Sequence, residues 1–180
     1  MKRFPYILQA LVCILLVVID QLTKVWARGP IKENPITIIE GVFSLHYLEN
    51  RGSIWGILQG KVDVLLIFSI LIFLGLIYTY VKLPKTEHYL LLSWVLIVVA
   101  AGAIGNTIDR LFFGFVTDFL YFELINFPIF NIADCYLTLC AFFICYLILF
   151  GKYKEDSFKF LLPRRKGNSD NETATNSDEN

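Results

Sequence analysis

Four long stretches of this chain carry no charged side chain, and no other feature constrains its fold as strongly. They run from Phe4 to Ile19, from Val64 to Val81, from Tyr89 to Ile108 and from Cys135 to Gly151. The hydrocarbon core of a bilayer is crossed by about 20 residues of α-helix. The first and last stretches approach this length once a residue or two with a polar side chain is included. Their apolar residues are continuous rather than alternating, which favours helices over transmembrane strands.

Composition supports lipid as the main solvent of the chain. Hydrophobic residues make up 56% of the sequence and charged residues 18%, with a mean hydropathy of +0.60. Soluble domains carry about 25% charged residues. We therefore predict an all-α integral membrane protein with four transmembrane helices, at about residues 5–25, 64–82, 89–109 and 133–151. The net charge is zero, so the chain has no basic surplus of the kind that nucleic-acid binding uses, and no nucleic-acid partner is expected.

The positions of lysine and arginine predict the orientation. Basic residues precede the first span (Lys2, Arg3), occupy the short link between the second and third spans (Lys82, Lys85) and follow the fourth span (residues 152–166). The positive-inside rule places all three segments in the cytoplasm. An alternative, a cleaved signal peptide at the start, lacks a small-x-small cleavage motif and would leave three spans.

Two parts of the chain lie outside the predicted spans. The sequence "NPITIIEGVFSLHYLENRGSIWGIL" alternates in places and is rich in residues that favour strands, so a small extracytoplasmic β platform is predicted within residues 27–63. Residues 1–154 then form one four-span membrane domain. Residues 155–180 are predicted to be a disordered polar cytoplasmic tail, since the sequence after Gly167 has little to bury.

Four acids and two amides are predicted to meet near the outer membrane surface. Three of the acids lie at the outer ends of spans, and the fourth lies in the loop between the third and fourth spans. Each amide precedes an acid by three residues, so the two share a helix face. Ionisable groups at membrane depth are costly and suggest a functional site. The residues are Asp20, Asp109, Asp118 and Asp134, with Asn106 and Asn131.

Each of these residues also has a structural interpretation. Asn131 can cap a helix with Asp134 in its first turn. Asp109 can form an ion pair with Arg110, and Asp20 can be an acid at a helix end. Their convergence at one depth favours a site, because buried polar groups need each other, water or a substrate for solvation.

Two carboxylates that meet can share one proton, so that one acts as a base and the other as an acid at the same pH. This is sufficient to hydrolyse a peptide bond with water and without a metal. The cysteines have no CxxC spacing and no histidine beside them, and neither a P-loop nor a GxGxxG motif is present. His46 and His88 fall on opposite sides of the membrane in the predicted topology. We therefore expect no metal and no cofactor.

A membrane protein of another class also uses intramembrane acids. A small proton-coupled transporter would place its acids near the bilayer midplane and would show an inverted repeat. In this sequence the acids lie toward one face and no such repeat is evident. A peptidase is therefore favoured, and the transporter is kept as the alternative.

Five short motifs resemble a known family, lipoprotein signal peptidase, also called signal peptidase II. They occur in the order expected for that family and lie on a four-span chain of suitable length, which makes the resemblance specific. The motifs are "DQLTK" at Asp20, "NRGSIWG" at Asn50, "GAIGNTIDR" from Gly102, "VTDF" from Val116 and "FPIFNIAD" from Phe127. Small departures occur at Arg51, Ala101 and Thr117, none of which removes a catalytic group.

The resemblance implies an activity and a site. It implies a bacterial inner-membrane endopeptidase, with four helices, a β cradle and an extracytoplasmic helix. Its substrates would be diacylglyceryl-modified prolipoproteins, cut on the amino side of the lipidated cysteine near the outer face. Asp118 and Asp134 would be the catalytic pair. The supporting residues would be Asp20, Asn50, Asn106, Asp109, Arg110 and Asn131. The expected partners are these substrates and membrane lipid, with a monomeric enzyme. Aromatic side chains near the site, including Phe119, would lie at the lipid headgroups.

Overall fold

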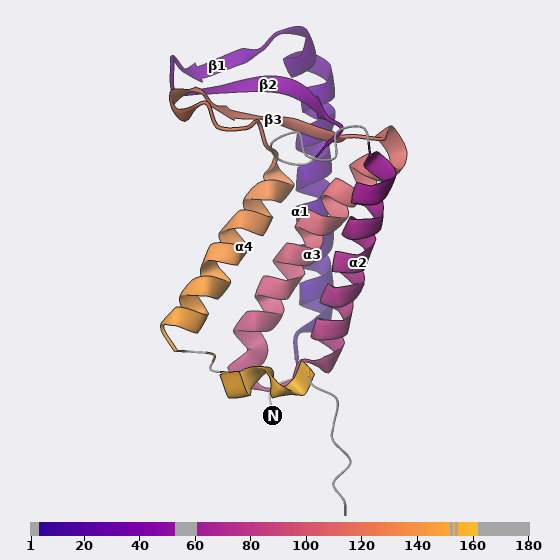
Figure 1. Cartoon of the computed structure of the whole chain (residues 1–180), viewed down its shortest axis with the longest axis vertical. Coiled ribbons are helices and arrows are strands. Elements are labelled where there is room, and N and C mark those ends of the chain that lie inside the picture. The colour runs from indigo at the N-terminus through magenta and orange to yellow at the C-terminus, as the bar shows by residue number, and fades with distance from the viewer. Residues whose placement is uncertain (1–3, 53–60, 152, 154, 162–180) are drawn as a thin grey trace, which may run out of the picture.

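Four long helices and a small antiparallel sheet make up the computed structural model, which describes residues 4–52, 61–151, 153 and 155–161. Each helix is long and apolar enough to cross a membrane. The sheet lies across one end of the helices, as Figure 1 shows. The predicted fold class is thereby confirmed. The helices are α1 (Tyr6–Trp26), α2 (Val62–Lys82), α3 (Glu87–Phe113) and α4 (Ile132–Leu149).

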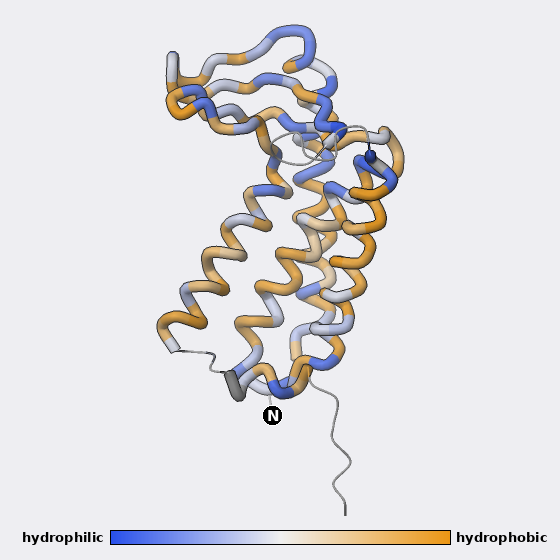
Figure 2. Tube along the Cα trace, in the orientation of Figure 1, coloured by the Kyte–Doolittle hydropathy of each residue, from blue (hydrophilic) through white to orange (hydrophobic). Residues whose placement is uncertain are grey.

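Helix α3 is the central element, because α1, α2 and α4 all pack against it. Gly102 lets α4 approach closely: a Cβ atom there would lie 2.8 Å from the carbonyl oxygen of Ala133. Small residues at such contacts are typical of helix packing in membranes, where apolar burial from water provides no drive. Apolar residues cover the helices along their length, and polar residues gather near the two ends (Figure 2).

The sheet has three strands in the order β1-β2-β3, all antiparallel. Strands β1 (Ile36–Ile39) and β2 (Phe43–Asn50) come from the segment predicted to form the platform. Strand β3 (Val116–Phe122) comes from the segment between α3 and α4, where a loop was predicted. Its first four residues are all buried, so the strand lacks the apolar–polar alternation that signals a half-exposed strand.

The segment predicted to contain the platform starts with a helical turn. Residues Ala27–Ile31 continue α1 as a π-helical turn, η1, and the first strand begins at Ile36. Ala27 and Ile31 pack with Leu45 and Phe119 in a buried cluster that fixes the sheet on the end of α1. Phe119, only 2% exposed, therefore belongs to this core, and its expected place at the lipid headgroups is wrong.

The resemblance also implies an extracytoplasmic helix. Among the described residues between the spans, the helical segments are η1 and the short 3-10 helix η3 (Glu123–Ile125). Part of the "NRGSIWG" motif lies at residues 53–60, outside the described residues.

The other end of the bundle carries a second buried cluster. Tyr153 packs there with Leu83 and Leu147, and the 3-10 helix η4 (Glu155–Leu161) covers them through Phe158 and Phe160. The disorder predicted from residue 155 is therefore wrong for Glu155–Leu161, because two phenylalanines give this segment apolar surface to bury. Residues 162–180 lie outside the described part. Helix η4 lies at the same end of the bundle as the N-terminus (Figure 1).

Candidate active site

Asp118 and Asp134 line one cavity of about 360 Å³ beneath the sheet. Asp118 is the third residue of β3, and Asp134 is the third residue of α4. The cavity also borders α2 and α3, so all four elements meet there. Two acids that are 16 residues apart in the sequence therefore face one space.

Asn131 links the two carboxylates. Its side-chain oxygen accepts a hydrogen bond from the Asp134 N–H at 3.0 Å, and its own N–H donates to Asp134 Oδ2 at 3.2 Å, which completes a capping box for α4. Its Nδ2 donates to Asp118 Oδ1 at 2.6 Å. The helix-capping interpretation of Asn131 is correct, and the same side chain also holds Asp118.

Asn50 holds the other oxygen of Asp118. Its Nδ2 donates to Asp118 Oδ2 at 2.8 Å. The N–H of Gly52 donates to Asn50 Oδ1 at 3.1 Å, which orients the amide so that its NH₂ group faces the carboxylate. Asp118 therefore accepts one hydrogen bond on each oxygen.

Asn106 holds Asp134 in a similar way. Its Nδ2 donates to Asp134 Oδ1 at 2.8 Å, while Lys24 Nζ donates to Asn106 Oδ1 at 2.8 Å. An ammonium group can only donate, so Lys24 requires the Asn106 oxygen on its side and thereby directs the NH₂ group toward Asp134. Lys24 thus sets the orientation of an amide that touches a candidate catalytic acid.

Lys24 is fully buried between two acids. Its Nζ lies 2.9 Å from Asp20 Oδ2 and 3.8 Å from Asp109 Oδ2. Asp20 Oδ1 also accepts the N–H of Ala133 at 3.0 Å, in the first turn of α4. Lys24 was not predicted as a site residue. Its spacing of four from Asp20 on one helix was the available signal.

Asp109 fixes the start of β3. Its Oδ2 accepts the N–H of Thr117 at 2.8 Å, and its Oδ1 lies 3.4 Å from Arg28 Nη1. Arg28 also donates to Thr117 Oγ1 at 2.8 Å. The structure thus assigns Lys24 and Arg28 to Asp109 as its ion-pair partners, which corrects the proposed pair with Arg110. Arg28 was not predicted; it lies on the helical turn η1, in the segment that was assigned only to the outside of the membrane.

Arg110 instead borders the cavity. Its Nη1 donates to Ser69 Oγ on α2 at 3.1 Å, and both residues line the cavity. The guanidinium charge acts on Asp118 and Asp134 as well as on Asp109. The site therefore has a positive group facing the same space as the two acids.

Burial perturbs the titration of Asp118. Its pKa is raised to about 7, first by burial and then by the charge of Asp134. The hydrogen bonds from Asn50 and Asn131 and the charge of Lys24 oppose this shift without cancelling it. Near neutral pH, Asp118 can therefore take up or release a proton beside a second acid, which is the behaviour that acid–base catalysis by a carboxylate pair requires.

One wall of the cavity is apolar and borders the lipid side. Leu65, Phe68 and Ile72 of α2 line it, with Leu137 of α4. Phe68 is 55% exposed and Ile72 57% exposed, so these two side chains also lie on the outer surface of the bundle. The apolar wall of the cavity is thus formed in part by side chains on the outer surface of the bundle.

The comparisons with known proteins agree with one another. Residues 12–150 match the family model described as Signal peptidase (SPase) II, Peptidase_A8. A lipoprotein signal peptidase of Clostridium novyi is 38% identical over 131 residues, covering 71% of this chain and 87% of the relative. One of Clostridioides difficile is 37% identical over 149 residues, covering 82% and 99%.

Two solved structures, both described as bacterial membrane enzymes, share the fold. One has a TM-score of 0.75 at 31% identity and covers 86% of this chain and 96% of its own. The other has a TM-score of 0.73 at 32% identity and covers 82% and 96%. The chain therefore belongs to the signal peptidase II family of aspartic peptidases.

Proposed function

We propose that Asp118 and Asp134 are the catalytic pair with which this chain removes signal peptides from diacylglyceryl-modified prolipoproteins, on the amino side of the lipidated cysteine. The observation that carries the proposal is Asn131, which hydrogen bonds to both carboxylates where they face one cavity. The pKa of Asp118 near 7 adds the capacity to hold a proton at neutral pH. Removal of signal peptides from prolipoproteins is the activity of the family.

The reaction would use one proton shared by the pair. The ionised carboxylate takes a proton from water as the water oxygen attacks the peptide carbonyl carbon. The protonated carboxyl gives its proton to the carbonyl oxygen, which forms a neutral tetrahedral intermediate. When the C–N bond breaks, the carboxyl group that took the proton from water gives it to the departing cysteine nitrogen. A hydroxyl of the intermediate gives its proton to the other carboxylate, and the signal peptide leaves with a new carboxyl group. Each member of the pair thereby regains its starting protonation state.

The supporting residues would hold this pair in position. Asn50 and Asn131 direct amide hydrogens to Asp118, and Asn106 directs one to Asp134. Asp20 and Asp109 hold the first turn of α4 and the start of β3 through backbone N–H groups. Arg110 faces the cavity and would contact the substrate backbone near the scissile bond.

The substrate would reach the site from within the membrane. Two acyl chains keep the scissile bond at the membrane surface, and the apolar wall around Phe68 and Ile72 suits a lipid-anchored peptide. We place the enzyme in the bacterial inner membrane as a monomer, with the cavity near the outer face and both chain ends in the cytoplasm. The distribution of lysine and arginine supports this orientation.

The test is in vitro cleavage of a diacylated prolipoprotein by purified variants at matched folded concentration. Asp118→Asn and Asp134→Asn should each reduce the rate by about 10³-fold or more, and the double variant should lose little more, because the two residues act as one unit. Asp63→Asn, a change at an exposed acid where α2 begins, is the matched control and should cleave normally. A near-normal rate for Asp118→Asn or Asp134→Asn would contradict the assignment.

The same assay tests the metal-free mechanism. Among the described residues, no three His, Cys, Asp or Glu side chains are grouped to hold one ion. Cleavage should therefore persist in excess chelator. Activity that disappears with the chelator and returns with one divalent ion would replace the carboxylate pair with a metal mechanism.

A further inference from the structure

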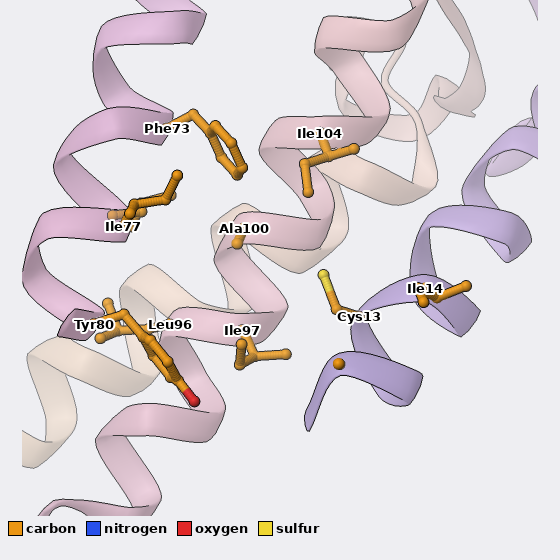
Figure 3. A pocket seen from close by; sticks show the side chains of 11 residues that line it. Cys13, Ile14, Phe73, Ile77, Tyr80, Leu96, Ile97, Ala100 and Ile104 are labelled. Atoms are coloured by element: carbon orange, nitrogen blue, oxygen red, sulfur yellow. The ribbon is translucent and has the colours of Figure 1, made fainter. Parts of the chain in front are cut away.

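A second cavity lies between α1, α2 and α3, toward the end of the bundle opposite the sheet. Its volume is about 340 Å³, within the range of about 300 to 1,000 Å³ that ligand pockets span. Figure 3 shows side chains of all three helices around it, including Cys13, Phe73, Ile77, Ala100 and Ile104. We call this cavity the lateral groove.

Small side chains create the lateral groove. Helices α1 and α2 both pack on α3, and Ala10, Cys13 and Ala100 leave the space between them unfilled. On α3 the lining runs from Leu96 to Ile104, a length of about 12 Å at 1.5 Å per residue. One leaflet of the hydrocarbon core is about 15 Å thick. The lateral groove is thus nearly as long as one leaflet is deep.

The polar groups near the lateral groove already have partners. Gln9 is fully buried; its Nε2 donates to Ser93 Oγ at 2.7 Å, and its Oε1 accepts the hydroxyl of Tyr80. These bonds join α1, α2 and α3 at the end of the groove that is farther from the sheet. They leave an apolar lining, which selects an apolar ligand.

Lys85 lies beside Tyr80, a lining residue at the end of the lateral groove that is farther from the sheet. Its Nζ donates to the backbone oxygen of Tyr80 and lies 4.2 Å from the centre of the Tyr80 ring and 5.2 Å from that of Phe4. The side chain is exposed, and partial burial lowers the pKa of its ammonium group. Within the described residues, no ion pair of an Asp or Glu with Lys85 is found. A positive group is therefore available beside Tyr80, which itself lines the groove.

We propose that the lateral groove binds one acyl chain of an anionic phospholipid whose phosphate contacts Lys85. An acyl chain matches both the apolar lining and the length of the groove. A peptide helix does not: at a diameter of about 10 Å, 12 Å of helix fills roughly 900 Å³, well above the volume of the groove. The choice of leaflet rests on the proposed orientation, which puts Lys85 on the cytoplasmic side, where anionic lipids attract lysine.

The experiment uses the purified full-length chain in mixed micelles with a phosphatidylglycerol that carries a photoreactive diazirine in one acyl chain. After irradiation, mass spectrometry maps the labelled peptides. We expect saturable labelling of the segment from Leu96 to Ile104, displaced by unlabelled phosphatidylglycerol at lower concentration than by phosphatidylcholine. Labelling that does not saturate would show contact with bulk lipid only and would overturn the proposal.

Four variants separate the two parts of the site. Ala100→Phe fills the groove and should remove the saturable labelling, whereas Ala141→Phe, on an exposed face of α4, should not. Lys85→Ala should raise the half-saturating concentration of phosphatidylglycerol about fivefold and abolish its advantage over phosphatidylcholine. Lys82→Ala, a charge change at the same membrane surface but away from the groove lining, should retain that advantage.

The prolipoprotein cleavage rate shows that each of these variants is folded. Unchanged labelling in Ala100→Phe would overturn the assignment of the groove, and an unchanged lipid preference in Lys85→Ala would overturn that of the headgroup. Displacement of the photolipid by a synthetic signal peptide would also overturn the proposal, because the groove would then belong to the substrate.

Discussion

Adding one methyl group at Gly102 should slow cleavage while the protein remains folded. A Cβ atom there would lie 2.8 Å from the Ala133 carbonyl oxygen and 3.1 Å from Leu137 Cγ. Ordinary van der Waals contact begins at 3.4 Å, so α4 must move by about 0.6 Å. The backbone atom that is displaced belongs to the residue immediately before Asp134.

The effects of Gly102→Ala on stability and on the cleavage rate have separate causes. Overpacking costs about 1–3 kcal/mol, and replacing glycine by alanine in a helix returns about 1 kcal/mol. The net loss of stability is therefore about 0–2 kcal/mol. A displacement of about 1 Å in a catalytic constellation can cost 10²-fold in rate. A shift of about 0.6 Å at Asp134 should thus lower kcat by roughly 10-fold or more.

The assay compares Gly102→Ala with Gly75→Ala in the same membrane protein. No atom lies within 4 Å of a Cβ placed at Gly75, so this variant gains only helix propensity. We would measure initial cleavage rates at matched folded concentration and the Tm in detergent. Gly75→Ala should cleave normally with an unchanged or higher Tm. A Gly102→Ala enzyme within twofold of the wild-type rate would refute the argument that the approach of α4 at this glycine positions Asp134.

Four further predictions concern the charged groups and the orientation of the chain. Because the pKa of Asp118 is raised from 3.8 to about 7, cleavage should decline as the pH rises through about 7 and the pair loses its shared proton; a pH–rate profile that is flat from pH 6 to 9 would contradict this. The same shift means that the folded state binds the proton more tightly than the unfolded state. The contribution of Asp118 to the free energy of unfolding should therefore fall as the pH rises from about 4 to about 7, as denaturation at a series of pH values would show. Lys24→Met should cost about 3–5 kcal/mol in denaturant unfolding, because it leaves Asp20 buried without its ammonium partner, and any folded fraction should cleave slowly because Asn106 loses the donor that orients it; wild-type stability would contradict this. In intact cells, a cysteine placed in residues 167–180 should resist a membrane-impermeant thiol reagent, and its labelling would overturn the proposed orientation.

The sequence predicted the parts of the fold that depend on local composition. Long runs without charge define the four helices, since the requirement of the bilayer is a matter of length and hydropathy. Strand β3 was missed because the strand with which it pairs, β2, is far away in the sequence and because its first four residues are all buried. Helix η4 was missed because its structure depends on the packing of Phe158 and Phe160 against a cluster that other helices form.

The candidate site was predicted unevenly for a similar reason. The acids and amides stood out because polar groups are rare in such an apolar chain, and five motifs resembled one family. The basic partners did not stand out, since lysine and arginine near a span end are common and are usually assigned to orientation. Which acid Lys24 or Arg28 neutralises depends on how α1 packs on α3, and helix periodicity alone does not determine that contact.

The pairing of Asp20 with Lys24 also bears on how the protein is made. The first helix emerges from the ribosome before α3 and α4 exist, so its buried acid, Asp20, has to enter the membrane without the N–H of Ala133 as a partner. Because Lys24 lies one turn beyond Asp20 on the same helix, with the charged atoms 2.9 Å apart, the segment carries its own counter-ion. Moving this lysine to α3 while keeping the final contacts would leave the charge of Asp20 uncompensated in the newly synthesised α1. Its insertion would then depend on the later helices arriving in time.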